Sequence, residues 1–161
     1  MEYNLTDQWI RKNPNRWIAG ALGGLFAGTV MAVVAMLVSA KVGMQPTFPL
    51  KLVASVLLGA QATDYEAGAH FILLGLIAHE VLAMFIGIIF GHFVTAKTFV
   101  GNTAMGLVWG LFSWIFMWNL FFQSFSTVLA AHISSAAVFP ICLAFGISLA
   151  SVGLFDRLMS N

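Results

Sequence analysis

Glu80 is the residue whose type and position most directly suggest chemistry. It lies in a long apolar stretch, because Glu80 and Lys97 are the only charged residues between Ala67 and Phe155. An ionised carboxylate at the centre of a membrane-spanning helix costs about 2.5–3.5 kcal/mol. Glu80 is therefore expected to be protonated, to hydrogen-bond a polar neighbour or to face water. With the adjacent His79 it is a candidate proton relay or cation-transport site.

The same carboxyl group also has a structural interpretation. No Lys or Arg lies at a matching depth in the sequence, so the partners of Glu80 would be neutral polar groups or a group of another subunit. The candidate partners within the chain are His79, Thr29, Ser113 and Ser148. His79 lies on a stripe of small residues and is expected to face protein. There a neutral imidazole can hydrogen-bond across a helix interface, or ligate haem or a metal.

Two more histidines occur near the starts of apolar segments. His70 begins the second long segment and His132 the fourth, so both are expected on the same side of the membrane. Two imidazoles at one depth can clamp the iron of haem b from opposite sides. They can also share a divalent metal such as zinc or copper, assisted by Asp64 or Glu66. The alternative is that they are interface histidines without a ligand.

His92 follows His79 by 13 residues, a spacing similar to that of the histidine pair in one helix of diheme membrane cytochromes b. That family needs a second helix with a matching pair. No other predicted helix of this chain carries two histidines, so the resemblance covers a few residues of one helix.

The composition excludes most soluble classes of protein. Apolar residues make up 60% of the 161 residues and charged residues 8%, against about 45–50% and about 25% in soluble domains. This balance excludes a soluble enzyme and a disordered tail. The net charge of +1 gives no broad positive surface of the kind that binds nucleic acid. One cysteine, Cys142, excludes a disulfide framework. Standard catalytic signatures are missing, so no catalytic residue is assigned and no enzymatic activity of its own is expected.

These features predict an all-α integral membrane protein. A span needs about 20 apolar residues, and a helix satisfies its own backbone within lipid. Four transmembrane helices are predicted at about 17–42, 67–94, 100–122 and 132–155, in a single membrane domain of residues 17–158 that follows a cytoplasmic segment of residues 1–16. A short helix at about 49–60 is predicted either to lie at the interface or to re-enter the membrane packed on protein. As an interfacial helix it would carry Lys51 and Ser55 on one face and Leu50, Val53 and Leu57 on another.

Basic residues predict the orientation, because cytoplasmic loops carry the excess of Lys and Arg. One side would hold Arg11, Lys12, Arg16, Lys97 and Arg157, and the other Lys41 and Lys51. Both termini are therefore predicted in the cytoplasm, and the membrane is expected to be the bacterial inner membrane. The first apolar segment is expected to be a permanent anchor.

Small and aromatic residues predict how the helices pack. The predicted packing positions are Gly20, Gly24 and Gly28 on the first helix and Gly75, Gly87 and Gly91 on the second. Such stripes let helix backbones approach closely, within one bundle or between subunits. On the third helix, Trp114 and Trp118 are expected in packing and in an aromatic belt, or against the ring of a pigment or quinone.

Three functions follow from these features. The favoured one is a non-catalytic structural or accessory subunit of a larger membrane complex of respiratory or redox type, because the chain is small, has short loops and offers many packing faces. The second is a small homo-oligomeric transporter or channel that handles protons or cations through Glu80 and His79. The third is an electron-transfer protein that binds haem or a metal through His70 and His132. The expected partners are lipid and other membrane subunits or further copies of the chain, and not nucleic acid.

Overall fold

The computed structural model describes residues 13–94, 98–122 and 134–160. The described residues form helices and their connections, with no strand among them. In chain order the helices are α2 (Pro14–Lys41), α3 (Phe48–Leu58), the 3₁₀ turn η1 (Ala60–Thr63), α4 (Ala69–Phe93), α5 (Phe99–Phe116), the π-helical turn η2 (Met117–Phe122), α8 (Ser135–Ser148), the 3₁₀ turn η3 (Leu149–Ser151) and α9 (Val152–Ser160).

Four of these helical stretches are long and apolar enough to cross a membrane. They are Pro14–Lys41, Ala69–Phe93, Phe99–Asn119 and Ser135–Met159, and α3 is a shorter apolar helix between the first two. The prediction of an all-α membrane protein with four spans and one short helix is confirmed. The connection between the third and fourth predicted spans, residues 123–131, lies outside the described residues.

Local sequence signals explain where the first and last spans begin. Asn13 caps α2, because its side chain accepts a hydrogen bond from the Arg16 backbone at 3.3 Å, and Pro14 follows at a position that needs no N–H donor. Ser134 caps α8 in the same way by accepting from the Ala137 backbone at 3.3 Å. α2 ends before Gly43, whose φ of 81° favours glycine and turns the chain toward α3.

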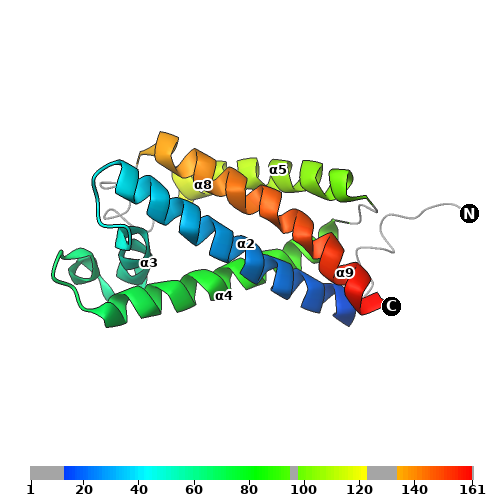
Figure 1. The fold of residues 1–161 in the computed structure, drawn as a ribbon, viewed down its shortest axis with the longest axis horizontal. Coiled ribbons are helices and arrows are strands. Elements are labelled where there is room, and N and C mark those ends of the chain that lie inside the picture. The colour runs from blue at the N-terminus through cyan, green and yellow to red at the C-terminus, as the bar shows by residue number, and fades with distance from the viewer. Residues whose placement is uncertain (1–12, 95–97, 123–133, 161) are drawn as a thin grey trace, which may run out of the picture.

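α2 is the central helix of the bundle. It contacts α4, α3, α8 and α9, whereas α5 packs mainly on α8 (Figure 1). The backbones of α2 and α4 approach most closely where glycines face each other. A β-carbon on Gly20 would lie 2.6 Å from the Gly87 carbonyl oxygen, and one on Gly24 would collide with the Ala83 carbonyl. Gly91 of α4 also faces Gly20 of α2. The contact between Gly20 and Gly24 of α2 and Ala83, Gly87 and Gly91 of α4 is called here the α2–α4 seam.

α5 and α8 meet through a second glycine contact. A β-carbon on Gly106 would collide with the Gly146 carbonyl, one on Gly146 would collide with the Gly106 carbonyl, and one on Gly110 would lie 2.7 Å from the Cys142 carbonyl oxygen. In lipid, the hydrophobic effect does not bring helices together. Dispersion contacts between closely spaced backbones drive helix association instead.

α4 and α5 approach each other in one half of the bundle only. Phe90 and Trp109 meet there edge to face, with ring centroids 5.8 Å apart. In the other half α3 fills the space between the long helices (Figure 1). Leu52 of α3 is 2% exposed and packs with Val138 and Cys142 of α8. The backbone of α3 rests on α4 at Gly75, where a β-carbon would collide with the Leu50 carbonyl.

The α5–α8 contact can be tested by adding one methyl group. We expect Gly106→Ala to lower the free energy of unfolding by about 1–3 kcal/mol, because the new methyl group must push the Gly146 backbone away. Thermal unfolding of the purified protein in detergent measures the effect. The matched control is Ala104→Val, which adds volume on an exposed position of the same helix. Equal melting temperatures for the two variants would contradict the close contact.

Candidate functional site

Glu80 lies at the α2–α4 seam, as the twelfth of the 25 residues of α4. Its Oε1 atom is 3.2 Å from the Thr29 hydroxyl of α2. Four neutral partners were expected for Glu80. Of these, Thr29 is the one whose hydroxyl group lies within hydrogen-bond distance of the carboxyl group in the described contacts. Thr29 is exposed on the surface of the isolated chain and Glu80 is half-buried. The Glu80–Thr29 pair therefore lies at the outer edge of the seam, halfway along the span.

The hydroxyl of Thr29 has two neighbours but a single proton to donate. It lies 3.0 Å from the Leu25 carbonyl and 3.2 Å from Glu80 Oε1. The hydroxyl group therefore lies between an acceptor of its own helix and the carboxyl group of α4.

Gly28 of α2 lies beside both the second carboxyl oxygen of Glu80 and the ring of His79. Glu80 Oε2 is buried and has no hydrogen-bond donor among the described residues. It lies against Gly28, where a β-carbon would be 2.7 Å away. On the same residue, the Gly28 carbonyl accepts a hydrogen bond from His79 Nε2 at 3.0 Å. One glycine thus provides space for Glu80 and a backbone acceptor for His79.

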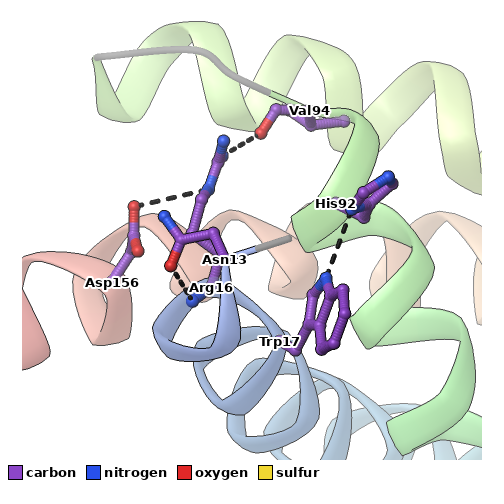
Figure 2. Close-up of polar contacts among 6 residues, drawn as sticks. All are labelled: Asn13, Arg16, Trp17, His92, Val94 and Asp156. Carbon is purple, nitrogen blue, oxygen red and sulfur yellow. Dashed lines mark hydrogen bonds and ion pairs between the residues drawn. The ribbon is translucent and has the colours of Figure 1, made fainter. Parts of the chain in front are cut away.

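A second set of polar contacts joins three helices at the end of the bundle where Arg16 and Asp156 lie, called here the charged end (Figure 2). Arg16 of α2 pairs with Asp156 of α9, with 3.6 Å between Nε and Oδ2. Its guanidinium also donates to the Val94 carbonyl at the end of α4. Beside them, Trp17 Nε1 donates to His92 Nδ1 at 3.2 Å. His92, whose spacing from His79 resembles that of a haem-ligating pair, accepts a hydrogen bond here.

Lys51 forms a third polar cluster at the opposite end. It is 2% exposed, and its ammonium group donates to Gln45 Oε1 at 3.1 Å and to the carbonyls of Asp64 and Tyr65 at 3.1 Å and 3.0 Å. These three acceptors match the three N–H bonds of an ammonium group. The cluster fixes α3 to the segments before and after it.

The polar face expected for an interfacial α3 is buried, and Leu50 of the expected apolar face is buried as well. Lys51 and Ser55 are buried, whereas Leu57 is 68% exposed. The physical reason is that Lys51 and Ser55 find acceptors within the protein, and the Ser55 hydroxyl donates to the Leu52 carbonyl at 2.7 Å. An apolar side chain such as Leu57 can remain exposed to lipid at no cost. α3 is therefore a helix packed on protein.

Of the two histidines expected to hold haem or a metal, His70 is among the described residues and His132 lies outside them. His70 is exposed, and its ring lies against that of Phe71 at an interplanar angle of 37°, with ring centroids 4.1 Å apart. The described part of the chain contains no group of three or more His, Cys, Asp or Glu side chains arranged to hold a metal ion. Asp64, an expected helper ligand, offers its backbone carbonyl to Lys51. The metal and haem hypothesis for His70 and His132 stays a prediction.

Trp114, expected in packing or against a ring ligand, has protein partners. Its Nε1 donates to the Ser135 carbonyl at 3.2 Å, and its ring meets Phe139 edge to face at 5.2 Å. Trp118 packs against the cluster around Leu52. Trp114 of α5 and Trp118 of η2 thus pack on the cluster formed by α3 and α8.

The sequence analysis missed the roles of Lys51 and Arg16 between helices. The available signal for Lys51 was a lone cation inside an apolar helical segment, where a buried partner is the usual reason for its presence. Arg16 gave no such signal, because a basic residue before a span is also what the orientation rule requires.

The fold defines a class, a four-helix membrane-spanning protein with one short helix packed among the spans. The chain matches no protein-family model, no curated protein and no solved structure. Its function is therefore argued from the clusters described above.

The Lys51 cluster can be tested by removing the ammonium group at similar side-chain length. We expect Lys51→Met to lower the free energy of unfolding by about 1–3 kcal/mol, because buried carbonyl groups lose their donor. Unfolding of the protein in detergent followed by circular dichroism measures the change. Lys41→Met is the matched control, since Lys41 is exposed. A Lys51→Met protein as stable as the control would show that the cluster does not hold α3 in place.

Proposed function

We propose that the chain is a non-catalytic structural subunit of a larger membrane assembly. The observation that carries the proposal is the Glu80–Thr29 pair, which places hydrogen-bonding groups at the exposed edge of the seam and halfway along the span. Acyl chains have no group to offer such a pair, and polar residues in spans generally face protein or a water-filled cavity. A neighbouring membrane subunit would supply the missing environment.

The use of the other polar groups supports a structural role. His79, Trp114 and Lys51 each bond to a backbone carbonyl of another element. Arg16 connects α2 to α4 and α9. These groups hold helices together, and this is the behaviour expected of a scaffold. A respiratory or redox complex is the proposed setting, and its other subunits would carry the cofactors.

We also propose that both termini lie on the cytoplasmic side of a bacterial inner membrane. Arg16 and the Arg157 region lie together at the charged end, because Arg16 pairs with Asp156. Lys51, one of the two basic residues assigned to the other side, is buried and committed to three oxygen atoms. Lys51 therefore contributes little to the count of basic residues that orient the chain. The excess of such residues on the side of the charged end becomes larger.

The assembly can be tested by extraction under mild conditions. We expect native mass spectrometry of the tagged protein, extracted from its own membrane, to give particles well above the 17.4 kDa of one chain. Glu80→Leu is expected to release a larger share of free chain, whereas the lipid-facing substitution Val108→Leu, at a site 62% exposed, should not. A wild-type protein that is always a lone monomer would overturn the proposal.

A second candidate function has one specific observation in its favour. The buried Oε2 of Glu80 has no donor among the described residues, and a carboxyl group that is only half satisfied can exchange a proton. Under this alternative, Glu80 would carry protons or cations across the seam with His79 nearby. Both side chains have neighbours that a relay would have to release, namely Thr29 and the Gly28 carbonyl.

Flux through reconstituted liposomes separates this alternative from a purely structural role. If Glu80 carries protons, Glu80→Gln abolishes an imposed proton flux, because an amide cannot release and regain a proton at neutral pH. Thr29→Val is the companion variant, since it removes the hydroxyl neighbour and keeps the carboxyl group. No flux in the wild type, or the same flux in Glu80→Gln, would remove the alternative.

A further inference from the structure

The contact between Trp17 of α2 and His92 of α4 fixes the protonation of the histidine ring. An indole N–H can only donate, so His92 Nδ1, which lies 3.2 Å from Trp17 Nε1, must offer a lone pair. A neutral imidazole with its proton on Nε2 meets this requirement, whereas an imidazolium carries a proton on both ring nitrogens. The contact drawn in Figure 2 therefore requires a neutral His92.

Protonation of His92 would place two donors opposite each other. The proton taken up at Nδ1 would point at the indole N–H, and no acceptor would remain between the two rings. The hydrogen bond would be lost, and one ring would have to turn away. Imidazole is the side chain that changes its charge between about pH 5 and about pH 8. His92 lies in the last turn of α4 and is only half-buried, so water at the end of the span can supply the proton.

The helices packed on α4 provide few charged groups around the ring. α2 brings Arg16, and α9 brings Asp156 and Arg157. Asp156 pairs with Arg16 at 3.6 Å. The third neighbour, α3, rests on Gly75 at the opposite end of α4. A proton on His92 therefore adds a positive charge at an end of the bundle whose one carboxylate among the described side chains is already paired.

The same contact helps to hold the start of α2 on the end of α4. Trp17 is the fourth residue of α2, and His92 precedes the last residue of α4. Next to them, a β-carbon on Gly91 would lie 3.0 Å from the Arg16 carbonyl oxygen. The Arg16 guanidinium donates to the Val94 carbonyl. In the described contacts two side-chain hydrogen bonds thus join the two helix ends, and one of them depends on the charge of His92.

From these observations we propose that Trp17 and His92 form a pH-sensitive switch at the charged end. Neutral His92 holds the start of α2 on the end of α4, and protonated His92 releases it. The bond from Arg16 to the Val94 carbonyl remains in both states, so the switch loosens the first turns of α2 and leaves the bundle folded. In the proposed orientation this end lies in the cytoplasm, and the switch responds to cytoplasmic acidification. It requires no partner subunit, so its failure would leave the structural-subunit proposal in place.

Hydrogen exchange in the first turns of α2 tests the switch, measured by mass spectrometry on the purified full chain in lipid nanodiscs. Trp17→Phe removes the donor and keeps an aromatic ring. At about pH 8 this variant is expected to exchange roughly two- to tenfold faster than the wild type, the range for one net hydrogen bond. At about pH 5 the two proteins are expected to exchange alike, because the wild type has also lost the bond. The same ratio of rates at both pH values overturns the switch.

A second background assigns the pH dependence to His92. Asn offers an amide oxygen near the position of Nδ1 and does not titrate, so in His92→Asn the effect of Trp17→Phe is expected to be the same at both pH values. His70→Asn is the matched control, since His70 is exposed at the opposite end of α4. In that background the effect should still change with pH. A pH-dependent effect that persists in His92→Asn overturns the switch.

Nuclear magnetic resonance of the indole N–H groups observes the contact directly in the unaltered chain. The Trp17 signal is identified by its disappearance in Trp17→Phe, and circular dichroism checks that each variant folds. The signal is expected to move between about pH 8 and about pH 5 in the wild type, as the N–H loses its acceptor. In His92→Asn it should not move. A Trp17 signal that is independent of pH in the wild type overturns the switch.

Discussion

The close approach of α2 and α4 at their glycines is the constraint on which the rest of the bundle depends. Gly20 and Gly24 lie directly on the backbone of α4. At this separation Gly28 leaves room for the Glu80 carboxyl group and presents its carbonyl to His79. A larger residue at any of these positions would separate the helices and move both polar side chains away from their neighbours. The seam therefore determines both the packing and the local chemistry.

The solvent around the spans explains how the remaining polar groups are arranged. Lipid offers no hydrogen bonds, so each buried donor needs an acceptor within the protein. Helices provide few free carbonyls, because most are used inside the helix. The acceptors of Arg16, Lys51 and Trp114 accordingly lie at helix ends or in connections: the Val94, Asp64 and Ser135 carbonyls. These three side chains thus join one helix to the terminus or connection of another, whereas His79 bonds to the Gly28 carbonyl within α2.

The fourth span has an irregular backbone and packs on two neighbouring helices, α5 and α2. Pro140 lies inside α8, and the 3₁₀ turn η3 interrupts the helix before α9. α8 packs on both α5 and α2, and beyond the turn α9 packs on α2. Phe145 and Leu149, just before and at the turn, are both buried in the main core cluster.

Sequence alone predicted the helices well, because the length of an apolar stretch is set by the thickness of the membrane and not by tertiary contacts. It also placed Glu80 halfway along a span and Thr29 among its candidate neighbours. The acceptors of Lys51 could not be predicted, because the carbonyls of Asp64 and Tyr65 converge only when the connection folds back. Likewise, the choice of Gly28 as the acceptor for His79 follows from the register of α2 against α4.

The position of Lys51 has a consequence for the order of biogenesis. Its acceptors at Asp64 and Tyr65 belong to the connection that leads into α4, and the backbone of α3 rests on Gly75 of α4 itself. When α3 leaves the ribosome, this seat has not yet been synthesised, and a charged lysine has no reason to enter an oily phase alone. α3 can therefore dock on its partner only after the helix that follows it has been synthesised.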